Sequence, residues 1–400
     1  MKAVMYGAGN IGRGFVGAVF AQSGYRLCFI DVAEETTSAL QREGRYPVRI
    51  LSEEGSEDTW IEGVTAVDGR DIEQAAARIA DADIMATAVG VRALPLIAPV
   101  IAEGLKARFS GGAACINIII CENLIGADRI LAGLIKEHLS EAGRAAFDKQ
   151  VGLVEASIGR MVPLQTAEMR DGNPLRVCVE AYGFLPVDRA AFKGDPPLLQ
   201  GLVPLEPFDF YIQRKLFVHN MGHGICAYLG LLSGERFIAV AAARAEILCV
   251  AQNAMLESAR ALSAKYGQAL EDLLSHIQDL LCRFSNRALA DTCGRVGADT
   301  ERKLGSNDRF MGAIACCRAQ GVIPAFISAG AAAALDCHLR EKGLARTPEA
   351  ALAALEQIAG PEAVSGAPLV PVMYRILSEG GGVSALLREA LRLGRKPGVV

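Results

Sequence analysis

The sequence lacks several features that would assign it to well-defined classes of protein. None of its 11 cysteines belongs to a C-x-x-C pair, which argues against a zinc ribbon or a thioredoxin-like redox motif. The longest apolar stretches are rich in Ala and Gly and are shorter than a membrane span. The N-terminal residues run directly into a glycine loop, without the apolar region and cleavage site of a signal peptide. We therefore expect neither a membrane segment nor a secretory leader.

Positive charge is also scarce. The chain carries a formal net charge of −4 at pH 7, so we expect no binding to nucleic acid or to an anionic membrane. An anionic substrate would have to be held by a few local Arg or Lys residues. The cysteines are scattered through apolar runs, which is typical of reduced core residues and favours a cytoplasmic protein.

Material for large hydrophobic cores is abundant, because 51% of the 400 residues are hydrophobic and 22% are charged. In the N-terminal half, short apolar runs alternate with helical stretches such as 13–23 and 94–108. This alternation predicts an α/β fold with a parallel, doubly wound sheet of the Rossmann type. The predicted strands are 3–6, 26–30, 84–89, 114–120 and 151–155, with a further strand-like run over 175–184.

The second half has a different character. A passage rich in Pro and Gly at 194–207 breaks both periodicities, and it predicts a boundary between a domain over 1–200 and a domain over 201–400. Leu and Ala then recur at helical spacing, so we expect an all-helical C-terminal domain. The Ala-rich run 329–335 indicates close helix packing. The predicted helices are 207–232, 235–266, 268–284, 309–319, 326–342, 347–359 and 381–393.

A glycine loop follows the first predicted strand, with the pattern G-x-G-x-x-G. Its first glycine allows a tight turn, its second admits a pyrophosphate near the backbone, and its third lets the helix pack close to the strand. Exposed N–H groups and the helix dipole then favour the anion. The loop residues, which we expect to bind a dinucleotide, are Gly7, Ala8, Gly9, Asn10, Ile11 and Gly12.

Asp31 ends the second predicted strand, nineteen residues after Gly12. A carboxylate there accepts hydrogen bonds from ribose hydroxyls and repels a 2′-phosphate, so the sequence predicts NAD as the cofactor in preference to NADP. The competing interpretation is an ordinary turn in which Asp31 caps a helix. Arg13 either touches a phosphate or is a solvated arginine. Thr87 ends another predicted strand and is expected to line the cofactor crevice.

Three polar residues of the second half share one predicted helix. At about 100° per residue, Lys215, Asn220 and His223 project into a sector of about 140°. A desolvated lysine can take the proton of an alcohol, and Asn and His can stabilise the alkoxide that develops. His219 falls in the same sector and competes with His223. Spacing alone fits equally well a solvated lysine with histidines that only pack.

A second group of polar residues is Cys121-Glu122-Asn123, directly after the strongly apolar run 116–120. Polar residues at the carboxyl end of a buried strand lie where ligands bind in doubly wound sheets. The alternative is a simple turn at the end of a strand, for which Asn is well suited.

These motifs together resemble one family. They are GAGNIGRG at 7–14, TAVG at 87–90, CEN at 121–123, K-x4-N-x2-H within RKLFVHNMGHGICAYLG, and RKLGSNDR at 302–309. Their order and their spread over nearly the whole chain are similar to those of the long-chain, metal-independent polyol dehydrogenases, the mannitol dehydrogenase family. The compact length is similar to that of the branch specific for phosphorylated polyols.

The resemblance implies roles for individual residues. Lys215 matches the general base, Asn123 and Asn220 match the pair that holds the reacting oxygen, and His223 matches the residue that orients the alcohol. It implies a Rossmann domain followed by a helical domain with the site between them. The implied reaction is the reversible, NAD-dependent oxidation of mannitol 1-phosphate to fructose 6-phosphate by a metal-free, monomeric enzyme.

A phosphorylated polyol needs a cationic clamp, and the bidentate guanidinium of Arg suits phosphate. Arg302, Lys303 and Arg309 form the densest basic cluster of the second half, and Arg160 is a further candidate. A solvated basic turn paired with Asp308 is the alternative. The family commonly has an acidic residue before the arginine where this chain has Gly159.

Two other functions fit parts of the sequence. A related long-chain dehydrogenase could act on another sugar alcohol, another polyol phosphate or a hexuronate. A non-catalytic NAD-binding protein would also carry the glycine loop, but it would not need Lys215, Asn220 and His223 together.

Overall fold

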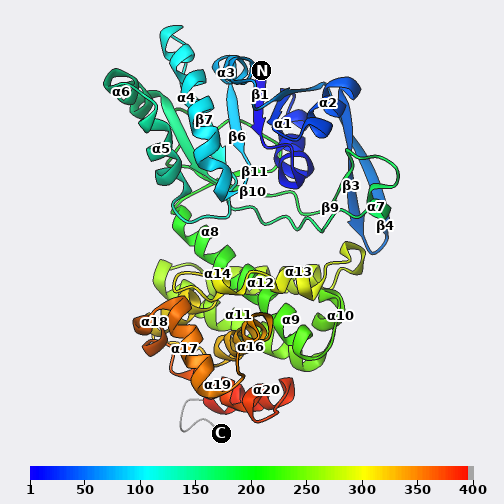
Figure 1. Cartoon of the computed structure of the whole chain (residues 1–400), viewed down its shortest axis with the longest axis vertical. Coiled ribbons are helices and arrows are strands. Elements are labelled where there is room, and N and C mark those ends of the chain that lie inside the picture. Colours follow the sequence, from blue (N-terminus) through cyan, green and yellow to red (C-terminus); the bar gives the residue numbers. More distant parts are fainter. Residues whose placement is uncertain (395–400) are drawn as a thin grey trace. The chain divides into compact units, whose positions relative to one another are not determined.

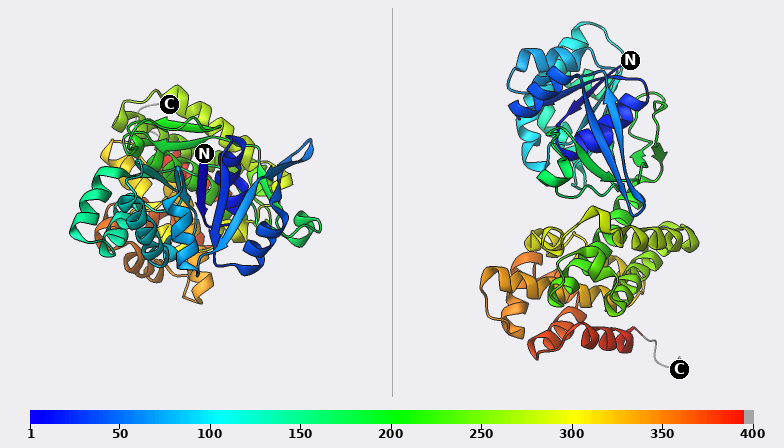
Figure 2. Two further views of the ribbon diagram at one scale, coloured as in Figure 1. Left: turned by 90° about the horizontal axis from the view of Figure 1, so that it is seen from above. Right: turned by 90° about the vertical axis from the view of Figure 1, so that its right-hand side faces the viewer.

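The computed structural model describes residues 1–394 and contains two compact units (Figures 1 and 2). The first unit comprises Met1–Tyr211, and the second begins at Ile212. Among residues 1–394, no helix combines the length and the apolar character needed to cross a membrane.

The first unit is built on a six-stranded parallel sheet in the order β5-β2-β1-β6-β7-β8. Tyr6 pairs with Ile30 on one side and with Thr87 on the other, so the loop after β1 emerges between two strand ends. The five strands predicted for this sheet are confirmed, although β6 and β7 are shorter than expected, and β5 was not predicted. The strands are β1 (Lys2–Tyr6), β2 (Arg26–Asp31), β5 (Val64–Asp68), β6 (Ile84–Thr87), β7 (Ile116–Ile120) and β8 (Val151–Glu155).

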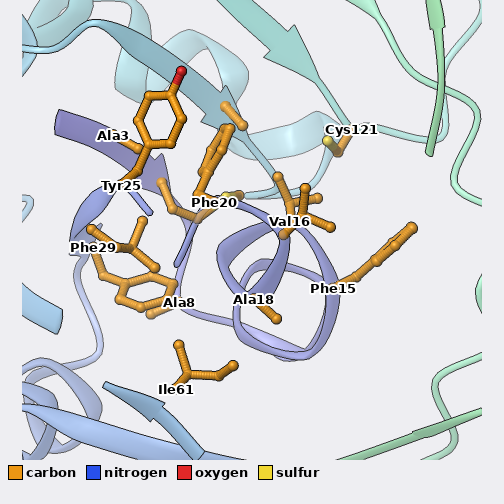
Figure 3. Close-up of a cluster of buried hydrophobic side chains, with 14 of the residues drawn as sticks. Ala3, Ala8, Phe15, Val16, Ala18, Phe20, Tyr25, Phe29, Ile61 and Cys121 are labelled. Atoms are coloured by element: carbon orange, nitrogen blue, oxygen red, sulfur yellow. The ribbon is translucent and has the colours of Figure 1, made fainter. Parts of the chain in front are cut away.

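Helices cover both faces of this sheet, as expected for a doubly wound fold (Figure 1). One face packs against α3 (Ile72–Ala80), α4 (Leu94–Ser110), α5 (Ala127–Glu137) and α6 (Glu141–Gln150). The other packs against the predicted helix 13–23, which divides into the π-helix η1 (Gly12–Val16) and α1 (Gly17–Gln22). Figure 3 shows Phe15, Phe20 and Phe29 in this second core. Two further helices of this unit are η2 (Val91–Ala93) and α2 (Glu34–Glu43).

Two smaller sheets complete the first unit. The hairpin β3 (Arg45–Ser52) and β4 (Gly55–Glu62) was not predicted, and β3 pairs in parallel with β9 (Val177–Glu180). Only these four residues of the strand-like run 175–184 form a strand. The Pro-rich passage also holds a strand, because β11 (Leu202–Leu205) pairs with β10 (Leu185–Asp188). The short helix α7 (Ala167–Arg170) precedes β9.

The second unit confirms the expected all-helical domain. Its described regular elements are helices, and one isolated β-bridge pairs Phe237 with Thr292. The predicted helix 207–232 is present as α8 (Phe208–Arg214), η3 (Lys215–Asn220) and α9 (Met221–Leu232). The predicted helix 235–266 is interrupted near Ala243. The others are α10 (Ile238–Ala242), α11 (Ala245–Tyr266), α12 (Leu270–Phe284), η4 (Arg287–Leu289), α13 (Cys293–Gly297), α14 (Thr300–Leu304), α15 (Met311–Ala319), α16 (Ala325–Lys342), α17 (Pro348–Ala359), α18 (Pro361–Ser365), α19 (Leu369–Ser378) and α20 (Val383–Leu393).

The centre of this unit is α16, which is buried along almost its whole length and contacts α9, α11 and α19. Its Ala-rich stretch allows the close packing that was expected. At Gly330, for example, a Cβ atom would overlap the side chain of Ile225 on α9. Close approach of α9 to this central helix fixes the segment that carries the candidate catalytic residues.

Candidate functional site

The glycine loop has the geometry that its sequence predicts. Gly7 has a φ of +103°, and a Cβ there would overlap the carbonyl oxygen of Ala88. A Cβ at Gly12 would overlap the carbonyl oxygen of Gly7, so the helix can start this close to the strand only with glycine. A Cβ at Gly9, in contrast, would meet no atom within 4 Å. The backbone at Gly9 therefore borders open space, as a loop that admits a ligand should.

Asp31 fixes this loop from the neighbouring strand. Its Oδ2 accepts a hydrogen bond of 2.6 Å from the backbone N–H of Ala8, and its Oδ1 accepts one of 2.9 Å from Ala33. The carboxylate thus stabilises the local turn, but Asp31 is not the cap of α2 (Glu34–Glu43), because the N-cap is Ala33 and it has no side-chain cap hydrogen bond. The carboxylate also lies directly beside the loop, and each carboxylate oxygen can accept a further hydrogen bond.

The helix after the loop is a π-helix, η1, in which bonds of the i→i+5 type replace those of the α-helix. Two side chains satisfy carbonyl groups in this irregular turn. Tyr46 Oη donates to the carbonyl of Arg13 at 2.8 Å, and Arg160 Nη1 donates to that of Gly14 at 3.1 Å. Segments of this kind often occur at functional sites.

Arg13 and Arg160 are both tied into this structure. Arg13 is buried and donates to the carbonyl of Leu175 at 2.9 Å, so it is not the solvated arginine of one interpretation. Arg160 also donates to the carbonyl of Glu180 at 2.9 Å and lies over the ring of Phe15. Burial lowers the pKa of Arg160 to about 10, against the opposing effect of Glu180.

The ends of β6 and β7 are joined by a carboxylate. Thr87 Oγ1 donates to Glu122 Oε2 at 2.7 Å, and the N–H of Val89 donates to Glu122 Oε1 at 3.0 Å. Glu122 is buried and Asn123 is exposed. Glu122 therefore holds the strand end from which Asn123 projects. The sequence pattern selected the segment but gave no role to Glu122.

The candidate catalytic residues of the second unit do not lie on a regular α-helix. Lys215 and Asn220 are the first and last residues of the π-helix η3, and His223 lies in the first turn of α9. The angles expected from 3.6 residues per turn were therefore wrong, because the i→i+5 turn changes the angle between successive side chains. The three residues remain on one continuous helical segment.

His223 is held by residues from distant parts of the chain. Its ring stacks on Phe284 of α12, with centroids 4.9 Å apart and planes 11° apart. Its Nε2 lies 3.4 Å from Oδ2 of the buried Asp291. Burial lowers the pKa of His223, and Asp291 opposes that effect. The sequence pattern did not identify Asp291 or Phe284, since nothing local to His223 points to either.

Asp291 also forms an ion pair with Arg295. Arg295 donates from Nε and Nη2 to the two carboxylate oxygens, at 2.6 Å each. Burial alone would raise the pKa of Asp291, but its pairing with His223 and Arg295 outweighs burial and lowers the pKa to about 2. The group is thus a carboxylate at any ordinary pH.

His219 is close to His223 but has different surroundings. It is buried, and its ring centroid lies 6.3 Å from that of His223 and 5.8 Å from that of Phe284. Burial, followed by the charge of Arg283, lowers its pKa well below the ordinary value. His276 of α12 behaves similarly, because burial lowers its pKa to about 3. The second unit therefore contains three histidines with lowered pKa values, of which His219 is buried and His223 and His276 are partly buried.

The three residues of the predicted basic cluster lie in three different environments. Arg309 is buried, and its Nη1 lies 3.5 Å from the carbonyl oxygen of Asn220, which places it at the catalytic segment. Arg302 pairs with Asp299 and Asp308. Lys303 is buried and its Nζ donates to the carbonyl groups of Val296 and Ala298, while burial lowers its pKa to about 8.

Comparison with known proteins identifies the family. The model of the mannitol dehydrogenase Rossmann domain matches residues 1–201, and that of the mannitol dehydrogenase C-terminal domain matches residues 207–349. The chain belongs to the mannitol dehydrogenase family.

Relatives within this family include two bacterial proteins named mannitol-1-phosphate 5-dehydrogenase. That of Geobacillus thermodenitrificans is 38% identical over 312 residues, which are 78% of this chain and 80% of that protein. That of Brevibacillus brevis is 36% identical over 335 residues, which are 84% and 86% of the two chains. Mannitol dehydrogenases are oxidoreductases, so the expected class of enzyme is confirmed.

Two solved structures have the same fold. Mannitol 2-dehydrogenase of Pseudomonas fluorescens, in a ternary complex with NAD and D-mannitol, has a TM-score of 0.78 at 17% identity and covers 98% of this chain and 94% of its own. A D-sorbitol dehydrogenase has a TM-score of 0.77 at 16% identity, covering 97% and 95%. The expected Rossmann domain with a helical C-terminal domain is thus confirmed.

Proposed function

We propose that this enzyme catalyses the reversible, NAD-dependent oxidation of mannitol 1-phosphate to fructose 6-phosphate. The names of the relatives support this substrate. The observation that carries the chemistry is the helical segment on which Lys215, Asn220 and His223 follow one another, with a π-turn between the first two.

The first unit fits NAD at the glycine loop. The open space at Gly9, the helix that starts at Gly12 and the carboxylate of Asp31 beside Ala8 suit a pyrophosphate and a ribose that carries two free hydroxyls. When bound, NAD accepts the hydride that leaves the alcohol carbon. Thr87 donates a hydrogen bond to Glu122 at the carboxyl end of β6. In a doubly wound sheet, such strand ends line the cofactor crevice.

We assign the proton transfer to Lys215, which takes the proton of the reacting hydroxyl as general base. The amide groups of Asn123 and Asn220 donate hydrogen bonds to the oxygen as negative charge develops on it. His223 orients the hydroxyl. These assignments need no metal ion, so we propose that activity persists after treatment with a chelator, and loss of activity on chelation would contradict this.

Among the basic residues, we propose Arg309 and Arg302 as the phosphate ligands. Arg309 contacts the segment that carries Asn220, and Arg302 shares Asp308 with it. Lys303 and Arg160 already donate to carbonyl groups within their own units, and this geometry favours a structural role for both.

The test of the function is a panel of ketoses assayed with NADH and with NADPH. We expect fructose 6-phosphate with NADH to give the highest kcat/KM, and fructose and tagaturonate to be poor substrates. Faster turnover of an unphosphorylated ketose or of a hexuronate would assign the chain to another branch of the family. Stoichiometric binding of NADH without turnover of any ketose would contradict the enzymatic function itself.

We further propose that the enzyme is a cytoplasmic monomer. All eleven cysteines lie in the described residues and are free thiols, as in a reducing compartment. Fractionation of the cells that produce it, and light scattering of the purified protein, test the two statements.

A further inference from the structure

Stacking on Phe284 fixes the plane of the His223 ring, but stacking alone does not fix which edge of the ring faces a given neighbour. Phe284 lies parallel to the imidazole at 4.9 Å, and it contacts the ring face in the same way after a half-turn about the Cβ–Cγ bond. The two ring orientations exchange the positions of carbon and nitrogen atoms, and only a polar group at the ring edge distinguishes them. The described polar group at that edge is the carboxylate of Asp291, 3.4 Å from Nε2.

The backbone holds Asp291 firmly in this place. Its carbonyl oxygen accepts a hydrogen bond of 2.9 Å from Ile238, and the next residue, Thr292, forms the bridge with Phe237. The hydroxyl of Thr292 accepts a hydrogen bond from the backbone N–H of Arg295. The guanidinium of Arg295 donates to both carboxylate oxygens of Asp291. Because both oxygens are held by a rigid bidentate pair, the carboxylate cannot easily turn away from the histidine.

We propose that Asp291 is a positioning residue of the dehydrogenase, which holds the proton of His223 on Nε2 and so leaves Nδ1 as a hydrogen-bond acceptor for the substrate hydroxyl. This inference rests on the proposed role of His223. A carboxylate accepts hydrogen bonds and cannot donate one, so it selects the ring orientation and the tautomer that point an N–H toward it. The 3.4 Å separation between Nε2 and Oδ2 is longer than a hydrogen bond, and catalytic hydrogen bonds that are long without substrate often tighten in the substrate complex.

The other titratable groups around His223 do not provide this selection. Arg309 faces it from the segment after α14, Arg295 lies beyond Asp291, and His219 lies one turn earlier on the same helix. The two arginines only donate hydrogen bonds, and both lower the pKa of His223. Asp291 is thus the group that decides which nitrogen is protonated.

The variant Asp291→Asn tests the proposal, because the amide can donate to Nε2 and so stabilise the opposite tautomer. ¹⁵N shifts of the imidazole, assigned by the signal missing in His223→Gln, report the tautomer without substrate. We expect the Nε2–H form in the native enzyme and a mixture or the Nδ1–H form in the variant. We also expect kcat to fall at least about tenfold, while the KM for NADH changes less than twofold.

Asp272→Asn is the matched control, since Asp272 is an exposed carboxylate of the same unit on α12. It should leave both the tautomer and kcat unchanged. If Asp291→Asn does not fold, Asp291→Glu keeps the charge but displaces it, and we expect the Nε2–H tautomer with a lowered kcat. An unchanged tautomer in Asp291→Asn, or a kcat equal to that of Asp272→Asn, overturns the proposal.

The two readouts separate this inference from the proposed function. If the native enzyme turns over a different ketose of the panel, the substrate assignment fails and the kinetic comparison is made with that ketose. If His223 changes its tautomer in Asp291→Asn and kcat falls on that substrate, the positioning role is supported whichever polyol is the natural one.

Discussion

The two units present their candidate functional residues in different ways. The first presents backbone groups, because glycines bring the chain close and the carboxylates of Asp31 and Glu122 hold the loop and strand ends. The second presents side chains, and it supports them with buried ionisable partners such as Asp291 and Arg309. The histidines follow the same division, since the first unit has one, the exposed His138, and the second has the other four.

This difference shows where each kind of site is vulnerable. The glycine loop and strand ends of the first unit form a backbone site, which tolerates changes in side chains but not an added Cβ where the chain segments approach most closely. A side-chain site depends on single residues and on the pH at which their partners hold the required charge. Removing one side chain, adding one methyl group, or protonating one cluster should therefore affect the two units differently.

The largest effect is expected from Lys215→Ala. Loss of the general base should lower kcat by about 10³-fold, because a positioned base contributes two to four orders of magnitude to such reactions. The affinity for NADH, measured by fluorescence titration, should stay within twofold, since the loop of the first unit is unchanged. Lys342→Ala, an exposed lysine paired with Glu301 in the same unit, is the control and should have native kcat. Native turnover in Lys215→Ala would show that another group takes the proton.

A pair of glycine variants tests the backbone site. Gly12→Ala should lower the free energy of unfolding by about 1–3 kcal/mol, because its methyl group overlaps the carbonyl of Gly7. Gly9→Ala should leave the unfolding free energy nearly unchanged, since its methyl group meets no atom within 4 Å. It should instead weaken NADH binding by about tenfold, because the methyl group would occupy the space proposed for the pyrophosphate. Equal effects of both variants on stability would contradict this distinction.

The same division explains what could be predicted from the sequence. The glycine loop, its flanking strands and Asp31 lie within thirty-one residues and obey local rules of backbone geometry, and their arrangement matches the prediction. The hairpin β3–β4 was missed because its outer strand is mostly polar and its pairing with β9 joins distant segments. The helix α19 was missed because prolines lie at its start, where a helix tolerates them.

The supporting residues of the second unit could not be predicted for a similar reason. Asp291 approaches His223 only because α12, η4 and the bridge at Thr292 turn the chain back toward α9. The π-turn between Lys215 and Asn220 was also not predicted, because no single residue in it departs from ordinary helical preference. The motif indicated which side chains matter, while tertiary packing determines how they are directed.

Mild acid should unfold the second unit before the first. Burial lowers the pKa of His276 from 6.5 to about 3, so the folded state binds fewer protons than the unfolded state between these values. The stability that this group contributes is present above pH 6.5 and is lost as the pH falls toward 3. At pH 4 the loss is about 3 kcal/mol from His276 alone, with His219 and His223 shifted in the same direction. Burial raises the pKa of Glu257 to about 8, which opposes this loss, and we expect the three histidines together to outweigh it.

The single tryptophan makes the two units distinguishable in this experiment. Trp60 lies on β4 of the first unit, whereas circular dichroism at 222 nm reports mainly the helices of the second. We expect the helical signal to be lost at a higher pH than the change in Trp60 fluorescence. His276→Gln should lower the pH at which the helical signal is lost, and His138→Gln should not. Coincident transitions in the native protein would show that the units unfold together.

The smallest effect is expected from Asp31→Asn, which addresses the carboxylate of the backbone site. The amide keeps an oxygen for one of the N–H groups of Ala8 and Ala33, but it loses the negative charge that repels a 2′-phosphate. The ratio of kcat/KM for NADH to that for NADPH should fall by about tenfold. Asp68→Asn is a matched control, because Asp68 pairs in register with Asp31 on β5 but is bound to Arg70. If Asp31→Asn weakens both cofactors equally and leaves the ratio unchanged, the carboxylate only stabilises the loop. A lower ratio shows instead that even in the backbone site one side chain selects the ligand.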